Sequence, residues 1–236
     1  MTMIQNPYMF DPYTKMLLHT RGADESTSFL DASPSNHTMT AQADAQIDTA
    51  VADPWGGNAG VMMLDGIGDY VSALDSADWN FAAGNWTVEG RFRFNSTSGI
   101  YPMIGQSEDS SKVVQFQYDA TNNKLGFFAD AAIPPDAIYE VDWTASADIW
   151  YHIAWVRSGT SIYCFIDGVA QSLTVSIAIG SGALPDLTSP LQIGYNIPYG
   201  FGGAEYFSGY IAEVRVSKGI ARWTANFTPP TQPYSS

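Results

Sequence analysis

Apolar and polar residues alternate in short runs along most of this chain. In residues 86–94 the bulky apolar side chains occupy one parity, and the charged residues Glu89, Arg91 and Arg93 occupy the other. A period of two predicts a half-buried β-strand. Runs of similar character predict further strands at 16–19, 60–64, 70–74, 100–105, 112–119, 124–129, 150–157, 161–167, 191–195 and 206–217.

Turn-forming residues separate these runs. Asn122-Asn123 and Ser158–Thr160 each lie between two predicted strands and indicate hairpins. A helical pattern is confined to 75–81 and 219–227, each long enough for one or two turns. Many short antiparallel strands predict an all-β sandwich or jelly roll. Without an internal repeat or a linker, residues 15–236 are predicted to form one domain.

The first 14 residues show no period and are predicted to form an arm outside that domain. A disordered terminus is the alternative. Tyr8, Phe10 and Tyr13 lie close together in this stretch, and leaving three aromatic side chains in water is unfavourable. We therefore expect the arm to dock on another protein through these three residues.

Composition narrows the range of partners. The chain has 24 acidic and 10 basic residues, a net charge of −14. Such a chain lacks the basic surface that nucleic acids require, and it does not favour an anionic membrane. The lone cysteine, Cys164, cannot form an internal disulfide and is expected to be a small core residue. The N-terminal residues resemble no secretory signal, so synthesis in a cytoplasm without membrane insertion is expected.

Several segments resemble, in order, the laminin-G-like, concanavalin-A-like jelly rolls that are common in tailed-phage proteins. The resemblance covers about Leu17 to Pro230. It implies an antiparallel β-sandwich jelly roll, a fold that serves enzymes, lectins and scaffolds alike. The segments are 19–24 with 29–37, Leu64–Tyr70 (a DGxGDY turn), Asn85–Phe92, Trp150–Arg157 with Ile166–Val169, and the closing stretch Gly209–Pro230.

The resemblance also implies a structural calcium ion where the first and last strands meet. Calcium prefers carboxylate and carbonyl oxygens. Asp24, Asp31 and Glu213 are the candidate ligands; the family often has an Asp pair where this chain has Ala212-Glu213. The alternative is that these acids are solvated loop residues.

Glycoside hydrolases of this fold use paired carboxylates. The nearest match is Glu140-Val141-Asp142, but Ala145 occupies the position of the third acid. This segment is interpreted as an acidic edge strand. His152 lies inside a predicted strand and is expected to be a core or rim histidine. We therefore expect no catalytic residues and no enzymatic activity.

A loop rich in aromatic residues joins two predicted strands near the end of the chain. It contains Tyr195, Tyr199, Phe201 and Tyr206. Exposed aromatic rings stack on the apolar faces of sugars, and loops are common places for binding residues. The alternative, slightly favoured here, is that these rings pack against a protein partner.

These features favour a structural or accessory virion protein, either a head decoration or a tail or fibre component. Its arm and protein contacts would hold it to other virion proteins, and closed homo-oligomers are expected. The alternative is a lectin-like module that binds host or surface glycans. An endo-glycanase is the least favoured function because of Ala145.

Overall fold

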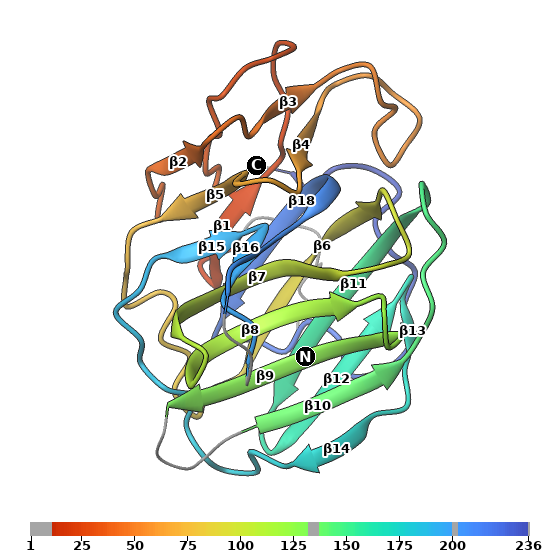
Figure 1. The fold of residues 1–236 in the computed structure, drawn as a ribbon. Coiled ribbons are helices and arrows are strands. Elements are labelled where there is room, and N and C mark those ends of the chain that lie inside the picture. The colour runs from red at the N-terminus through yellow and green to blue at the C-terminus, as the bar shows by residue number, and fades with distance from the viewer. Residues whose placement is uncertain (1–10, 132–136, 200–202, 236) are drawn as a thin grey trace.

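The computed structural model describes residues 11–131, 137–199 and 203–235, and these form two antiparallel sheets packed face to face (Figure 1). The described residues contain no α-helix. In this part of the chain there is accordingly no helix long and apolar enough to cross a membrane. The predicted all-β sandwich is therefore confirmed.

One layer, the β6 sheet, has the order β13-β12-β11-β6-β18-β4-β3, and β1 also pairs with β18. Its centre is built from strands far apart in sequence, because β6 lies between β11 and β18. The strands are β1 Thr14–Leu18, β3 Gln46–Asp48, β4 Val61–Asp65, β6 Trp86–Phe94, β11 Trp150–Ser158, β12 Ser161–Ile166, β13 Val169–Ala170 and β18 Ser208–Lys218.

The other layer, the β8 sheet, has the order β14-β10-β9-β8-β7-β15-β5-β2. A small ribbon, β16–β17, forms a third, two-stranded sheet. The strands are β2 Met39–Gln42, β5 Tyr70–Ala73, β7 Ile100–Asp109, β8 Lys112–Asp119, β9 Lys124–Ala131, β10 Ala137–Asp142, β14 Thr174–Ile177, β15 Leu191–Ile193, β16 Tyr195–Asn196 and β17 Glu205–Tyr206.

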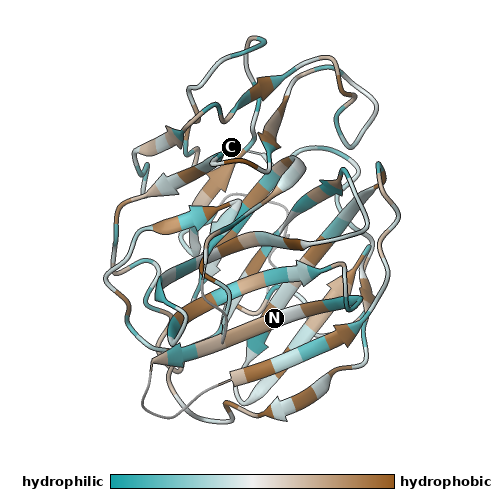
Figure 2. Ribbon diagram, in the orientation of Figure 1, coloured by the Kyte–Doolittle hydropathy of each residue, from teal (hydrophilic) through white to brown (hydrophobic). Residues whose placement is uncertain are grey.

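Aromatic side chains from both sheets fill the space between them. Trp86 of β6 packs edge-on against Phe116 of β8 and Phe127 of β9, with ring centroids 5.6 and 5.3 Å apart. Trp155 and Cys164 are also buried in this core. Brown and white-to-teal segments alternate along many strands in Figure 2, as the period of two predicts.

The face of β6 that points away from the core is buried, whereas the sequence predicts that it is exposed. Thr87 and Glu89 are fully buried although they face away from the core between the sheets. Trp223 and Tyr234, from the segment that follows β18, cover this face and are buried with them. The strand was predicted to be half-buried because its own pattern carries no information about a distant segment that covers it.

The two segments with a helical pattern form no helix in the structure. Residues 75–81 contain turns, and 219–227 follow β18 as irregular chain with bends at 219 and at 224–225. Short stretches form few internal hydrogen bonds, and packing decides their conformation. The strands β2, β3, β13 and β14 were not predicted; each has four residues or fewer.

The folded domain begins earlier than the predicted boundary at residue 15. Asp11 is buried and forms an ion pair with Arg222 at 2.9 Å, and Thr14 begins β1. Tyr13 accepts a backbone hydrogen bond from Lys218 and keeps 38% of its surface exposed. Tyr8 and Phe10 lie outside the described residues, so the arm contact they were predicted to make stays a prediction.

Candidate functional site

The β16–β17 ribbon and the loop after β16 lie against the outer face of the β8 sheet. Asn196 donates a hydrogen bond from Nδ2 to Oε1 of Gln117 on β8, at 2.8 Å. The backbone N–H of Ile197 donates to Oγ of Ser107 on β7, at 3.2 Å. These contacts fix the loop above the middle strands of the sheet.

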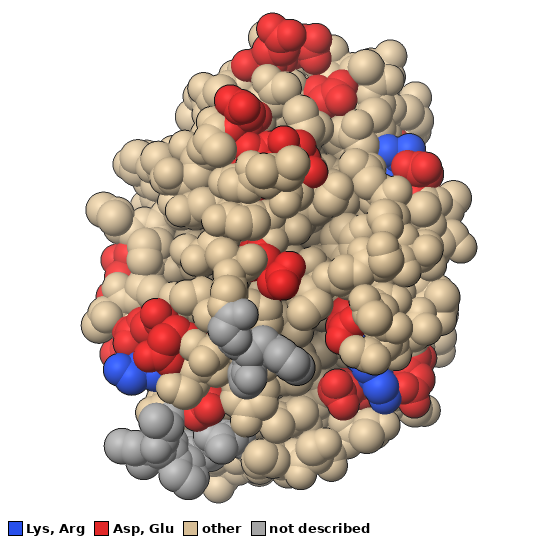
Figure 3. Space-filling model, viewed as in Figure 1, with Lys and Arg blue, Asp and Glu red and all other residues tan. Residues whose placement is uncertain are grey.

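Beside this loop lies a hollow of about 450 Å³, which we call the outer hollow. The ring of Tyr199 stacks on that of Phe128 from β9, with centroids 5.8 Å apart and planes 20° apart. Figure 3 shows this face of the molecule, on which acidic side chains outnumber basic ones. The lining residues are Ile100, Gln117, Asp119, Asn122, Lys124, Phe128, Glu140 and Tyr199.

The polar groups of the outer hollow include both acceptors and donors. Glu140 of β10 is half-buried. The Asp119 carboxylate already accepts hydrogen bonds from the backbone and the side-chain amide of Asn122. The Lys124 ammonium is paired with Asp142. A small aromatic wall with a few polar groups is typical of small-molecule sites, which occupy about 300–1,000 Å³.

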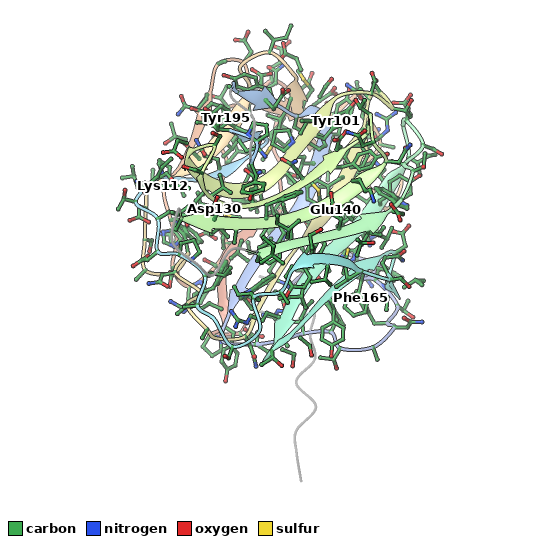
Figure 4. The ribbon with its side chains drawn as sticks, turned by 60° about the horizontal axis from the view of Figure 1, so that its bottom comes forward. Tyr101, Lys112, Asp130, Glu140, Phe165 and Tyr195 are labelled. Atoms are coloured by element: carbon green, nitrogen blue, oxygen red, sulfur yellow. The ribbon has the colours of Figure 1, made fainter. Side chains whose placement is uncertain are left out.

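A second group of rings lies at the other end of the ribbon. Tyr195 stacks on Tyr70 of β5 with centroids 4.8 Å apart, and Tyr206 lies 5.3 Å from Tyr195. Burial raises the pKa of Tyr195, and the neighbouring tyrosines add to this effect. Figure 4 shows Tyr195 well apart from Glu140 on this side of the molecule.

The predicted contact residues therefore divide between two places. Tyr195 and Tyr206 join the tyrosine group, Tyr199 lines the outer hollow, and Phe201 lies outside the described residues. The sequence analysis missed Phe128. Its position next to the core residue Phe127 on a strand indicates an outward-facing ring, and that parity could have identified it.

The structure does not bring the three proposed calcium ligands together. Asp31 accepts backbone hydrogen bonds from Leu17 and His37, at 2.9 and 2.8 Å. Asp24 accepts one from Thr49. Among the described residues, no group of three or more His, Cys, Asp and Glu side chains is placed to hold a metal ion. The Asp31 carboxylate thus serves as an acceptor for backbone N–H groups.

Glu213, the third candidate calcium ligand, pairs with a histidine. Its two carboxylate oxygens lie 3.0 and 3.1 Å from Nδ1 of His19, and it accepts a backbone hydrogen bond from Tyr234. Glu213 is buried and sits at a register shift in β18 with a positive φ of 50°. Its role in the described structure is to connect β1, β18 and the C-terminal segment.

The residues considered for catalysis lie in, or directly after, strands of the sandwich. Glu140 and Asp142 lie on β10, which has β9 on one side and β14 on the other, so the prediction of an edge strand is wrong. Ala145 is buried, and its N–H donates to the Tyr118 hydroxyl. As predicted, His152 is a core histidine, with Nε2 3.2 Å from Glu89.

Solved structures of low sequence identity share this fold. The binding domain of Paraclostridial Mosquitocidal Protein 1 matches with a TM-score of 0.62 and 13% identity, over 89% of this chain and 50% of that one. The botulinum neurotoxin serotype C1 binding domain matches with a TM-score of 0.61 and 9% identity, over 92% and 51%. The chain thus spans about half the length of these binding domains.

Domain 4 of AbnA, a GH43 extracellular arabinanase from Geobacillus stearothermophilus, was solved in complex with arabinotriose. It matches with a TM-score of 0.53 and 12% identity, over 89% of this chain and 95% of that one. At these identities the likeness shows the fold alone.

Sequence comparison gives a more specific result. No curated protein matches the chain in sequence. The sequence profile of the concanavalin A-like lectin/glucanases superfamily, in its laminin-G form, matches residues 65–222, well over half of the chain. The ordered motifs and the two-sheet sandwich agree with this match. The chain belongs to the concanavalin A-like lectin/glucanase superfamily.

Proposed function

We propose that this chain is a carbohydrate-binding module that holds an oligosaccharide in the outer hollow. The observation that carries the proposal is the stacked pair Tyr199 and Phe128 beside the carboxylate of Glu140. Sugar rings present apolar C–H faces that aromatic rings can cover, and hydroxyl groups that carboxylates and amides can bind. The outer hollow combines both kinds of group in one place.

The charges of the outer hollow favour a neutral sugar. Glu140 and Asp119 contribute two carboxylates, while the only lysine of the lining is already paired with Asp142. A uronic or sialic acid would bring a further negative charge to an acidic chain, and like charges repel. The arabinotriose bound by domain 4 of AbnA supports a neutral oligosaccharide as the ligand class.

We further propose binding without hydrolysis. Retaining glycosidases need two carboxyl groups about 5 Å apart in defined roles. In this chain Asp142 is paired with Lys124, and the third acid of the glucanase pattern is replaced by the buried Ala145. Glu140 is left to act as a hydrogen-bond acceptor for sugar hydroxyls.

The test is a glycan array followed by titration calorimetry with the best neutral oligosaccharide. We expect Tyr199→Ala to weaken binding at least about tenfold, equivalent to ~1.4 kcal/mol. Tyr13→Ala is the matched control, because Tyr13 is also partly exposed but lies outside the outer hollow. Unchanged affinity in Tyr199→Ala, or an array without a neutral glycan, would overturn the proposal.

A second proposal concerns where such a module is displayed. The ordered motifs of Gly209–Pro230 and the earlier segments resemble phage domains, which favours a place on a virion next to other virion proteins. The solved structures described above are domains of toxins and enzymes, so this proposal depends on the sequence motifs alone. Cryo-electron microscopy of particles from the source tests it: density for this sandwich supports a virion component, and its absence contradicts one.

A further inference from the structure

We propose that this chain has a second binding site, a pocket at the end of β1 that takes a small monocarboxylate with an aliphatic body. We call it the β1 pocket. Its lining comes from residues 18–21 and 28–30, with Ala32. None of these residues lines the outer hollow, so the proposal does not rest on glycan binding.

Two neighbouring stretches of chain form the walls of the β1 pocket. Residues 19–21 leave β1 and residues 28–30 return beside them, since Leu18 and Asp31 form an antiparallel bridge. Backbone hydrogen bonds of Ile47 on β3 anchor the turn between the two stretches. The pocket has a volume of about 240 Å³. Sites for drug-sized ligands occupy about 300–1,000 Å³, so this one fits a smaller molecule.

The floor of the β1 pocket is apolar. Leu18 and Phe29 belong to the core between the sheets, with 1% and 5% of their surfaces exposed. Leu30 also lines the pocket, yet 80% of its surface is exposed. An aliphatic ligand in the pocket would cover part of Leu30 and of the floor. Because this removes apolar surface from water, it favours binding.

Arg21 adds a positive charge to this apolar pocket. Its guanidinium carbon lies 5.9 Å from the ring centroid of Trp55, whose indole N–H donates to the carbonyl of Pro230. The Arg21 side chain is 38% exposed, so a ligand can reach it. Arginine binds carboxylates through two parallel hydrogen bonds. The hydroxyl of Ser28, an exposed residue of the lining, can donate another.

The acids close to the β1 pocket have other partners. Glu213 lies 4.0 Å from Nε of Arg21, which is too long for a hydrogen bond. Its oxygens instead accept hydrogen bonds from His19 and from the backbone of Tyr234. The Asp31 carboxylate accepts backbone hydrogen bonds in the same way. The described lining contains no acidic residue, so the Arg21 guanidinium keeps donors for a ligand.

The two sites of this chain therefore select different ligands. Glu140 and Asp119 make the outer hollow acidic, whereas the β1 pocket combines a cation with an apolar floor. A sugar in the β1 pocket would leave hydroxyl groups unpaired against Leu18 and Phe29, which is unfavourable. The net charge of −14 repels anions, but salt screens exposed charges beyond about 8 Å. At contact distance Arg21 decides, and it favours a carboxylate.

Backbone strain is also concentrated here. Thr20 is buried and has a positive φ of 54°. This conformation is unfavourable for a β-branched residue, and such strain tends to occur at ligand sites. Because Thr20 directly precedes Arg21, its conformation sets the direction in which the Arg21 side chain leaves the backbone.

The experiment is an NMR titration of the full ¹⁵N-labelled chain with hexanoate up to about 20 mM. The indole N–H of Trp55, assigned with a Trp55→Phe variant, reports on the site because Arg21 lies over its ring. We expect a Kd of about 1 mM, because the ligand is small. Hexanamide lacks the charge and acetate lacks the aliphatic body, so each should bind at least about tenfold more weakly.

Substitutions test the two parts of the pocket separately. Arg21→Met should weaken hexanoate binding at least about tenfold, and Leu30→Ser at least about threefold. The controls are Arg93→Met, which removes another arginine over an aromatic ring, and Leu74→Ser, at another leucine that is 80% exposed. Both controls should bind as the unchanged chain does. Equal affinity for hexanamide and hexanoate, full affinity in Arg21→Met, or an unshifted Trp55 signal would overturn the proposal.

Discussion

Replacing Arg215 with methionine should leave a buried carboxylate without its main counter-charge. Arg215 donates from Nε to Oε1 of Glu89 at 2.8 Å and from Nη2 to the same oxygen. The Glu89 side chain is 0% exposed, so water cannot replace the lost partner. The Arg215 guanidinium also lies 3.8 Å from the ring centroid of Tyr234, a contact that methionine does not reproduce electrostatically.

The expected loss is large for a single substitution. Removing one member of a buried ion pair typically costs about 3–5 kcal/mol. For a chain of this size that lowers Tm by roughly 6–20 °C. The matched control is Arg93→Met, which breaks a pair with Asp148 whose side chain is 62% exposed. Such a surface pair is worth less than about 1 kcal/mol.

The same pair predicts a dependence on pH. Burial alone would raise the pKa of Glu89, but the charge of Arg215 and the hydrogen bond with His152 outweigh it and hold that pKa far below its usual range. Since the pKa is lower in the folded state, the stabilisation is complete above the unfolded value of about 4.3 and is lost as pH falls below it. Stability should therefore decrease between pH 5 and pH 3, and less steeply in Glu89→Gln.

The assay is urea denaturation at pH 7 and at pH 3.5, followed by tryptophan fluorescence. The double variant Glu89→Gln, Arg215→Met should recover more than half of the loss, because no buried charge remains unpaired. An Arg215→Met variant within 1 kcal/mol of the wild-type chain would refute the reasoning. So would a double variant less stable than Arg215→Met.

Two further predictions concern other parts of the domain. Gly168→Ala should destabilise the chain by several kcal/mol more than Gly159→Ala in the same denaturation assay. Both glycines have positive φ, and only at Gly168 would a Cβ meet backbone, 2.0 Å from the Phe227 oxygen; equal losses would contradict this. Burial raises the pKa of the Cys164 thiol well above its usual range, so a disulfide reagent at pH 8 should label it only after unfolding. Rapid labelling of the native chain would show the opposite.

The local sequence pattern was sufficient to predict many of the strands and turns of the sandwich. The strands at 86–94 and 112–119 have the predicted bounds, and Asn122-Asn123 and Gly159 lie in hairpin turns. Alternation and turn preference depend on residues a few positions apart, so a single segment contains the information needed. The aromatic loop was recognised for the same reason, because its rings are close together in sequence.

Contacts between residues far apart in sequence determine which residues line the outer hollow. The outer hollow joins Tyr199 to Phe128 of β9 and Glu140 of β10, and none of these strands is next to the loop in sequence. Their outward faces meet because β8, β9 and β10 pair in register. The sequence showed the aromatic residues but not which of them would line a common space.

The local sequence pattern could predict neither which segment covers the outer face of a strand nor which strands pair. Glu89 was expected on an open face, yet it is buried against Arg215, 126 positions away. The edge position of β14, in place of the predicted edge strand at β10, also follows only from the order of the strands. The alternation of side chains establishes that a residue faces away from the core. Whether that face meets water, another segment or a second chain depends on contacts that only folding brings together.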